Sequence, residues 1–204
     1  MINYMIDKNC KKIVLTGGAC GGKTESLPFI KKHFTELGYD VYIVSEMATI
    51  LILGGITAPK VGGKNFQELV VGMQLEIQKT YERAISLSGN NKNLIIFDRC
   101  PIDAMMFISR EEFDDIANKF DKTYEEIINS YDGIIHMEAV AKTFPELYTS
   151  ENNNARRDEG DHTIETDNRL LEAYREHPNR VIIGSYKEFN EKVKKLIEEI
   201  EKIL

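Results

Sequence analysis

The sequence predicts an α/β fold in which five parallel strands form a doubly wound sheet with helices on both faces. Five short runs rich in Ile and Val are nearly continuously apolar, as in strands covered on both faces; they span 12–16, 41–45, 93–97, 133–137 and 180–184. The segments between them carry helical periodicity, and alternating strands and helices form parallel sheets with right-handed crossovers. The length of 204 residues suits a single domain, which we expect to span 1–204.

The segments between the strands differ in character. The first helical segment is predicted to end at Gly38 and the long second one near Gly89, because glycine is a natural residue at the end of a helix. The stretch 101–130 predicts an insertion of two or three short acidic helices. Residues 139–162 are polar, rich in Asn and without sustained periodicity, so we expect a lid-like flap there. The last segment is predicted to be a helix that packs one apolar stripe on the sheet, formed by Val193, Leu196, Ile197, Ile200 and Leu204.

Composition excludes several classes of function. A net charge of −7 argues against nucleic acid as a partner, because binding to phosphate backbones needs clustered Lys and Arg. The three cysteines lack a C-x-x-C pair, so they indicate neither a disulfide framework nor a zinc site. The sequence has no basic leader with an apolar run and no uninterrupted apolar run of ~18 residues. We therefore expect a cytoplasmic protein without a membrane partner.

A glycine-rich stretch separates the first predicted strand from the first predicted helix. Gly17-x-x-x-x-Gly22-Lys23-Thr24 satisfies the G-x-x-x-x-G-K-[ST] pattern of a P-loop. In such a loop, glycines let backbone N–H groups turn toward phosphates, the lysine reaches the β- and γ-phosphates, and the threonine ligates Mg²⁺. The stretch predicts a site for ATP and Mg²⁺ that is formed by Gly17, Gly18, Ala19, Cys20, Gly21, Gly22, Lys23, Thr24 and Glu25.

Two acidic residues stand where predicted strands end. Asp98 follows the third strand and Glu46 the second, so both are expected at the ligand-binding edge of the sheet, beside the P-loop. Asp98 resembles a Walker B acid, which would hold Mg²⁺ together with Thr24. Each acid also has a purely structural interpretation, because carboxylates cap helices well. Asp98 would cap a helix that begins near Pro101, and Glu46 one that begins at Met47.

Three arginines are candidates for contacts with phosphates. Arg156 and Arg157 lie in the expected flap, where their guanidinium groups would close over the phosphates and neutralise charge that develops during transfer. Adjacent arginines in a loop can also be merely solvated. Arg99 directly follows Asp98 and would meet a phosphate or form a structural ion pair, and the sequence does not choose between them.

Other classes of P-loop protein fit the sequence less well. A small GTPase would carry D-x-x-G after its third strand, whereas Arg-Cys-Pro follows Asp98. A literal N-K-x-D at 118–121 follows an acidic amphipathic segment rather than an apolar strand, so we interpret it as a coincidence. A mechanical or AAA+ ATPase would be larger, with a helical lid domain for which there is little room. A small-molecule kinase fits better.

Four segments resemble one group of P-loop proteins. "IVLTGGACGGKTES", "VYIVSEMA", "IIFDRCPIDAMMF" and "RRDEG" ahead of "DNRLLEAY" resemble the small P-loop ATP-binding proteins of an AAA-domain ATPase/kinase family. That group is similar to the nicotinamide riboside kinase domain and, more distantly, to deoxynucleoside and nucleoside monophosphate kinases. The resemblance runs from Lys12 to about Ile200, and its most specific parts are T-G-G-x-x-x-G-K-T and D-R-x-x-x-D.

The resemblance implies a role for each candidate residue. In the family pattern, an arginine commonly stands three residues after the Glu of the second strand; this chain has Thr49 there, so no specific acceptor is implied. The remaining pattern implies that Lys23 and Thr24 bind ATP·Mg²⁺ and that Asp98 binds the metal or the acceptor hydroxyl. It also implies that Glu46 binds the acceptor and that Arg156 or Arg157 acts in the lid.

The expected activity is therefore transfer of the γ-phosphoryl group of ATP to a small nucleoside-like or nucleotide metabolite, with Asp98 or Glu46 positioning or deprotonating the acceptor. The alternative is a regulatory nucleotide-dependent ATPase whose flap binds a protein partner. The apolar segment 47–59 is suited to lining a substrate pocket or to burial in a homodimer, and the sequence does not separate the two.

Overall fold

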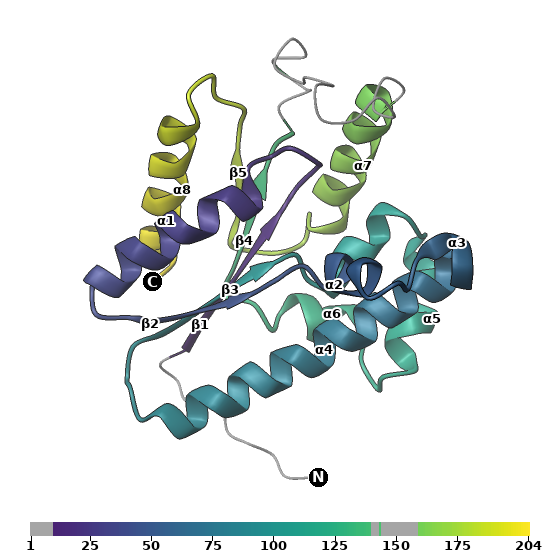
Figure 1. Ribbon diagram of the computed structural model, residues 1–204, viewed down its shortest axis with the longest axis horizontal. Coiled ribbons are helices and arrows are strands. Elements are labelled where there is room, and N and C mark those ends of the chain that lie inside the picture. Colours follow the sequence, from purple (N-terminus) through teal and green to yellow (C-terminus); the bar gives the residue numbers. More distant parts are fainter. Residues whose placement is uncertain (1–9, 140–142, 144–158) are drawn as a thin grey trace.

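The computed structural model describes residues 10–139, 143 and 159–204, and it confirms the predicted fold class (Figure 1). One sheet contains five strands in the order β2-β3-β1-β4-β5, and all four pairings between neighbouring strands are parallel. The strands are β1 (Cys10–Thr16), β2 (Asp40–Val44), β3 (Asn93–Asp98), β4 (Gly133–Met137) and β5 (Arg180–Ile183). Each coincides with one of the five apolar runs, with ends displaced by two residues at most.

Helices connect the strands and cover both faces of the sheet. The first crossover is α1 (Lys23–Glu36), and the second contains α2 (Met47–Leu53), α3 (Ala58–Val61) and the long α4 (Gly63–Ser88). Three short helices lie between β3 and β4, within the stretch where the sequence predicts them: η1 (Pro101–Met106), α5 (Arg110–Asn118) and α6 (Tyr124–Ile128). The described chain ends with α7 (Glu159–Ala173), β5 and α8 (Phe189–Ile203).

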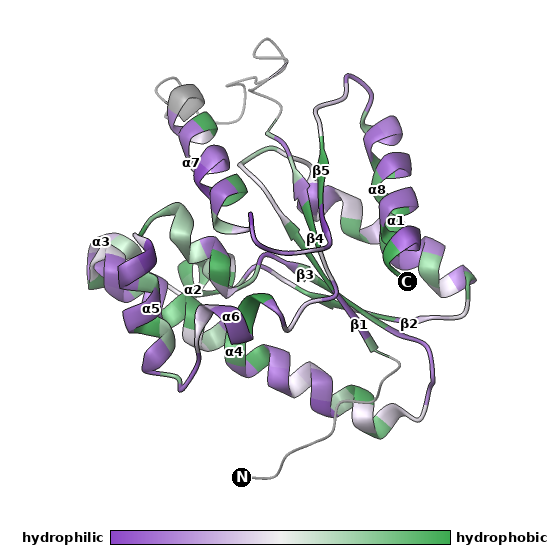
Figure 2. Ribbon diagram, turned by 180° about the vertical axis from the view of Figure 1, so that it is seen from behind, coloured by the Kyte–Doolittle hydropathy of each residue, from purple (hydrophilic) through white to green (hydrophobic). Residues whose placement is uncertain are grey.

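The central strands supply residues to two apolar clusters, one on each face. In β1, Ile13 and Leu15 pack with α1 and α8, whereas Val14 packs on the face that α4, α7 and η1 cover. Successive side chains of a strand point to opposite faces, so a strand buried on both sides must be apolar at nearly every position. Figure 2 shows the resulting apolar centre inside helices with polar outer surfaces. In the predicted stripe of α8, Val193, Leu196 and Ile200 are buried.

Local signals explain where several helices begin and end. Gly38 and Gly89, the two predicted terminators, adopt left-handed backbone angles just after α1 and α4. In α5, the Ser109 hydroxyl accepts a hydrogen bond from the Glu112 N–H at 3.1 Å, and the Glu112 carboxylate accepts one from the Ser109 N–H at 3.0 Å. This reciprocal pair satisfies two N–H groups that a helix start would otherwise leave free.

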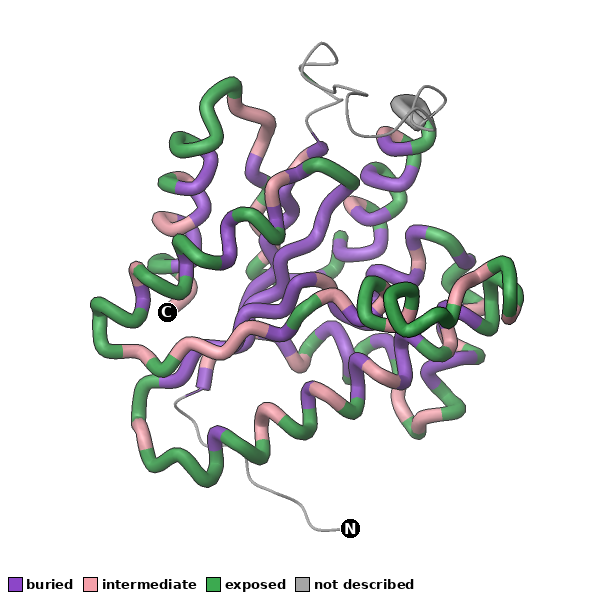
Figure 3. The backbone as a smooth tube through the Cα atoms, in the orientation of Figure 1, coloured by how far each residue is buried: buried purple, intermediate pink, exposed green. Residues whose placement is uncertain are grey.

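Segment 47–59 divides between the interior and the surface. Met47 is buried, whereas Leu53 is 82% exposed at the end of α2, where Figure 3 shows a largely exposed stretch. The expected flap at 139–162 lies mostly outside the described residues, and so do both of its arginines, Arg156 and Arg157.

Candidate active site

The P-loop lies between β1 and α1, where the sequence places it, and close packing explains its glycines. Gly17 has a φ of +124°, and a Cβ atom there would collide with the backbone carbonyl of Met137 at the end of β4. Gly22, at the N-terminal cap of α1, adopts a left-handed φ of +83°. Side chains disfavour both conformations, so glycine lets the loop turn tightly at these two positions.

Lys23 is buried at the first position of α1. Its Nζ donates hydrogen bonds to the backbone carbonyls of Gly17, at 3.0 Å, and Gly18, at 2.7 Å. Burial and, to a smaller extent, the nearby positive charge of Arg99 lower the pKa of Lys23 to about 8, against the opposing effect of the surrounding carboxylates. The ammonium group is thus held inside the loop, where its charge is poorly solvated and a phosphate would stabilise it.

Thr24 and Asp98 are brought together as the sequence predicts. The Thr24 hydroxyl donates a hydrogen bond of 2.7 Å to the carboxylate of Asp98, the last residue of β3. Burial raises the pKa of Asp98, and the hydrogen bond from Thr24 opposes that rise. Both groups offer oxygen atoms, which Mg²⁺ prefers. No group of three or more metal-ligating His, Cys, Asp or Glu side chains occurs among the described residues, and Mg²⁺ needs none when the ligand's phosphates supply the remaining oxygens.

Neither Asp98 nor Glu46 makes the capping hydrogen bond that a structural role at a helix start would involve. Cys100, and not Asp98, is the N-cap residue of η1, and the Asp98 carboxylate accepts the hydrogen bond from Thr24. Glu46 occupies the N-cap position of α2, but its carboxylate makes no capping hydrogen bond. It instead accepts hydrogen bonds from Arg99 Nε at 2.7 Å and from the Thr49 hydroxyl at 2.6 Å. Thr49 therefore holds the Glu46 carboxylate from within α2.

Arg99 forms the ion pairs that the sequence left open. Besides Glu46, its guanidinium group contacts Asp103, with an Nη1–Oδ1 distance of 3.1 Å. Burial alone would lower the pKa of Arg99, but the charges of Asp103, Glu46 and Asp98 outweigh burial and raise it. Its φ of +73° is rare for a residue other than glycine, so the backbone is strained at this point of the site.

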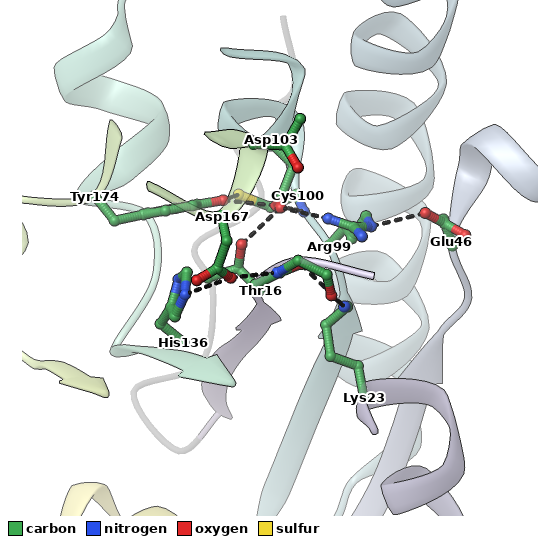
Figure 4. A network of polar contacts seen from close by, with 12 residues as sticks. Thr16, Lys23, Glu46, Arg99, Cys100, Asp103, His136, Asp167 and Tyr174 are labelled. Carbon is green, nitrogen blue, oxygen red and sulfur yellow. Dashed lines mark hydrogen bonds and ion pairs between the residues drawn. The ribbon is translucent and has the colours of Figure 1, made fainter. Parts of the chain in front are cut away.

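Asp103 is the centre of this network, although we did not predict it as a site residue (Figure 4). Its carboxylate accepts hydrogen bonds from the Thr16 hydroxyl at 2.6 Å, the Tyr174 hydroxyl at 2.7 Å and the Cys100 N–H at 2.9 Å, besides its contact with Arg99. The sequence signal for it was its position as the second acid of D-R-x-x-x-D, four residues after Arg99 and within η1.

A second unpredicted group reaches the P-loop from α7. Asp167 Oδ1 accepts a hydrogen bond of 2.6 Å from the Gly18 N–H, and it lies 2.9 Å from His136 Nε2 on β4. Both side chains are fully buried. Figure 4 shows His136, Asp167 and the loop side by side. The sequence carries no signal for this contact, because an isolated histidine in a strand does not indicate a partner on a distant helix.

A cavity of about 660 Å³ opens beside the P-loop. Ala19 of the loop, Glu46, Arg99 and Asp103 line it, together with residues of α2, α4, η1 and α7. Asp98 is not among the lining residues, so the two predicted acids occupy different places: Asp98 beside Thr24, and Glu46 at the cavity.

Three further predicted positions have no contact that assigns them a role. Cys20 is exposed in the loop with a φ of +56°, Glu25 is an exposed residue in the first turn of α1, and Gly21 packs on the end of β4. The N-K-x-D at 118–121 ends α5 rather than following a strand, and Lys119 forms an ion pair of 2.6 Å with Glu68.

Comparison with known proteins places the chain at the level of a family. No curated protein matches the sequence significantly. None of the described helices is long and apolar enough to cross a bilayer. One family model, described as an AAA domain, matches residues 12–192, which include the P-loop, Asp103, strands β2 to β5 and all but the first two residues of β1. The match agrees with the P-loop and with the observed strand order, and the chain therefore belongs to this AAA domain family.

Proposed function

We propose that this protein is a phosphotransferase that uses ATP and Mg²⁺ to phosphorylate a small nucleoside-like metabolite. The observation that supports this proposal most directly is the cavity of about 660 Å³. It adjoins the P-loop, and the carboxylate of Glu46 lines it. Its volume lies within the range of small-molecule sites. A nucleotide-binding loop beside an acceptor-sized cavity is the arrangement that transfer between two small molecules requires.

The proposed reaction assigns one task to each group. Lys23 and Mg²⁺, held by Thr24 and Asp98, stabilise the charge on the phosphates. An acceptor hydroxyl in the cavity attacks the γ-phosphorus, the bond from that phosphorus to the β–γ bridging oxygen breaks, and ADP leaves. Glu46 takes the proton of the hydroxyl, since it lines the cavity whereas Asp98 does not. In this reaction Arg156 and Arg157 would act as lid residues that close over the phosphates.

The variant Lys23→Ala tests the nucleotide site. The matched control is Lys31→Ala, which removes an exposed lysine from the same helix. ATP binding by calorimetry and phosphorylation of nucleosides, nucleotides and pyridine ribosides by mass spectrometry would be measured for both. We expect the Lys23 variant to lose both activities and the Lys31 variant to retain them. Unchanged binding and turnover in Lys23→Ala would refute the proposal.

A regulatory ATPase that acts through a protein partner is the second candidate. The observation that favours it is the exposed apolar surface of the second crossover, formed by Ile50, Leu53 and Ile56. Such a surface suits a partner protein or a second copy in a homodimer. This candidate predicts slow ATP hydrolysis that no small metabolite accelerates.

A further inference from the structure

Two buried acids hold the start of the P-loop from different elements. Asp103 of η1 accepts a hydrogen bond of 2.6 Å from the hydroxyl of Thr16, the last residue of β1. Asp167 of α7 accepts one of 2.6 Å from the Gly18 N–H. Asp103 is 4% exposed and Asp167 is fully buried. Hydrogen bonds to buried carboxylates are short and strong, so the first residues of the loop are fixed by partners outside it.

The helix α7 connects the two acids. Asp167 belongs to α7, and Tyr174 continues the last turn of this helix through a backbone hydrogen bond of 3.2 Å. The Tyr174 hydroxyl donates a hydrogen bond of 2.7 Å to Asp103 Oδ2 (Figure 4). Residues seven positions apart in a helix lie on the same face, about 10 Å apart along its axis. The sheet adds a second connection, because Thr16 pairs in register with His136, which contacts Asp167.

Asp103 also connects the loop to the cavity. Its Oδ1 atom accepts the hydrogen bond of Thr16 and one of 3.1 Å from Arg99 Nη1. Arg99 Nε donates in turn to the carboxylate of Glu46, at 2.7 Å. Asp103 Oδ2 accepts a further hydrogen bond from the Cys100 N–H, at 2.9 Å, which orients the carboxylate. Three successive contacts therefore lead from the last residue before the P-loop to the acid that lines the cavity.

We propose that Asp103 is a positioning residue that couples occupation of the P-loop to the placement of Glu46, while α7 holds Asp103 in register with the loop. Nucleotide phosphates would order the loop through its N–H groups and Lys23. An ordered loop fixes Thr16, and Asp103 and Arg99 transmit this constraint to Glu46. Coupling between two sites is reciprocal, so an acceptor held by Glu46 would favour nucleotide binding. The inference rests on the proposed function and adds the residues through which its two sites communicate.

Hydrogen exchange measured by mass spectrometry tests the coupling without an acceptor. The informative segments are α2 (Met47–Leu53) and η1 (Pro101–Met106), which lie outside the P-loop. Their exchange rates are compared without and with saturating adenylyl imidodiphosphate, a non-hydrolysable analogue of ATP, and Mg²⁺. Calorimetry confirms saturation for each variant. The ratio of the two rates is used, because a loss of overall stability raises both.

Four substitutions separate coupling from a structural role. Thr16→Val and Tyr174→Phe each remove one hydroxyl that donates to Asp103 and keep the shape of the side chain. Thr16→Ser keeps the hydroxyl. Tyr124→Phe is the matched control, because it removes an equally buried hydroxyl that donates to the Ala173 carbonyl, at 2.7 Å, and not to Asp103.

In the unmodified protein, we expect the nucleotide to slow exchange in both segments by about fivefold or more. Thr16→Val and Tyr174→Phe should each reduce this effect by half or more, whereas Thr16→Ser and Tyr124→Phe should retain it. The inference is overturned if the nucleotide does not slow exchange, if either Thr16→Val or Tyr174→Phe shows a smaller reduction, or if one of the two controls loses the effect.

Turnover of the same variants separates this inference from the proposed function. Phosphorylation of a nucleoside, nucleotide or pyridine riboside with the same kcat in Thr16→Val leaves the phosphotransferase proposal intact and removes the coupling role of Asp103. Slowed exchange that depends on Thr16 and Tyr174, without a phosphorylated product from any of these compounds, supports the coupling and contradicts the phosphotransferase proposal.

Discussion

At the scale of single residues, Asp98 and Glu46 show how similar side chains in different surroundings become suited to different roles. Asp98 accepts a hydrogen bond from Thr24 and lies apart from the cavity, whereas Glu46 lines the cavity and contacts Arg99 and Thr49. One carboxylate thus suits a metal and the other suits an acceptor hydroxyl. Variants of the two residues should fail in different ways.

Asp98→Asn should impair the metal rather than the acceptor. The substitution keeps the size of the side chain and an oxygen toward Thr24, but it removes the negative charge. We expect turnover to fall on the order of a hundredfold or more, with a higher Mg²⁺ concentration needed for half-maximal rate. A Mg²⁺ titration of initial rates checks this. An unchanged titration midpoint would show that Asp98 does not serve the metal.

The depressed pKa of Lys23 predicts how ATP binding depends on pH. Burial lowers the pKa to about 8, so between about pH 8 and the ordinary value of 10.5 the unfolded chain binds more protons at this residue than the folded one. The contribution of Lys23 to the free energy of unfolding therefore rises with pH across this window, and below about pH 8 its burial cost is present in full.

Bound ATP should raise the pKa of Lys23 again, because its phosphates stabilise the charged form of the lysine. Above about pH 8, binding should take up a proton, and ATP affinity should fall by up to about tenfold per pH unit. Calorimetry in buffers of different ionisation enthalpy measures the proton uptake. Lys192, whose pKa burial also lowers to about 8, provides a control: Lys192→Met should retain the uptake. Equal ATP affinity at pH 7.5 and pH 9.5 would contradict the prediction.

At the scale of elements, the sequence was informative where a pattern is local. Apolar runs and terminal glycines located the strands and helices, and parallel strands bring the residues at their carboxyl ends to one edge, which placed Asp98 and Glu46 near Lys23. The hydrogen bond between Asp167 and Gly18 joins residues 149 positions apart. The sequence around either residue does not indicate this contact, because α7 and the P-loop meet only when the helices pack on the folded sheet.

Asp167→Ala tests whether α7 supports the P-loop. The substitution removes the partner of the Gly18 N–H and of His136 in a fully buried site. We expect a loss of stability of about 1–3 kcal/mol, together with weaker ATP binding. Chemical denaturation and calorimetry measure the two effects. Glu165→Ala, an exposed change on the same helix, should alter neither; equal behaviour of the two variants would show that the contact is dispensable.

At the scale of the whole molecule, shape and charge bear on the choice of partner. The net charge of −7 leaves no general attraction for a polyanion, and carboxylates border the cavity beside the P-loop. Enclosure by α2, α4 and η1 favours a compact ligand over a strand that needs a continuous basic channel.

Single-stranded oligonucleotides should consequently be poor acceptors. With radiolabelled ATP and Mg²⁺, we expect no transfer of label to the 5′-hydroxyl of an oligonucleotide, even at low salt, where electrostatic binding is strongest. A free nucleoside in the same reaction serves as the comparison. Labelling of the oligonucleotide in preference to the nucleoside would overturn the choice of a small-molecule acceptor.

The most direct test of the central claim is the ratio of ADP released to phosphorylated compound formed, measured by mass spectrometry across nucleosides, nucleotides and pyridine ribosides. A phosphotransferase predicts that ADP release depends on one class of compound and that each ADP is matched by one phosphorylated product. The account would be contradicted if ADP release were slow, had the same rate with every compound and yielded only inorganic phosphate. That result would favour the regulatory ATPase.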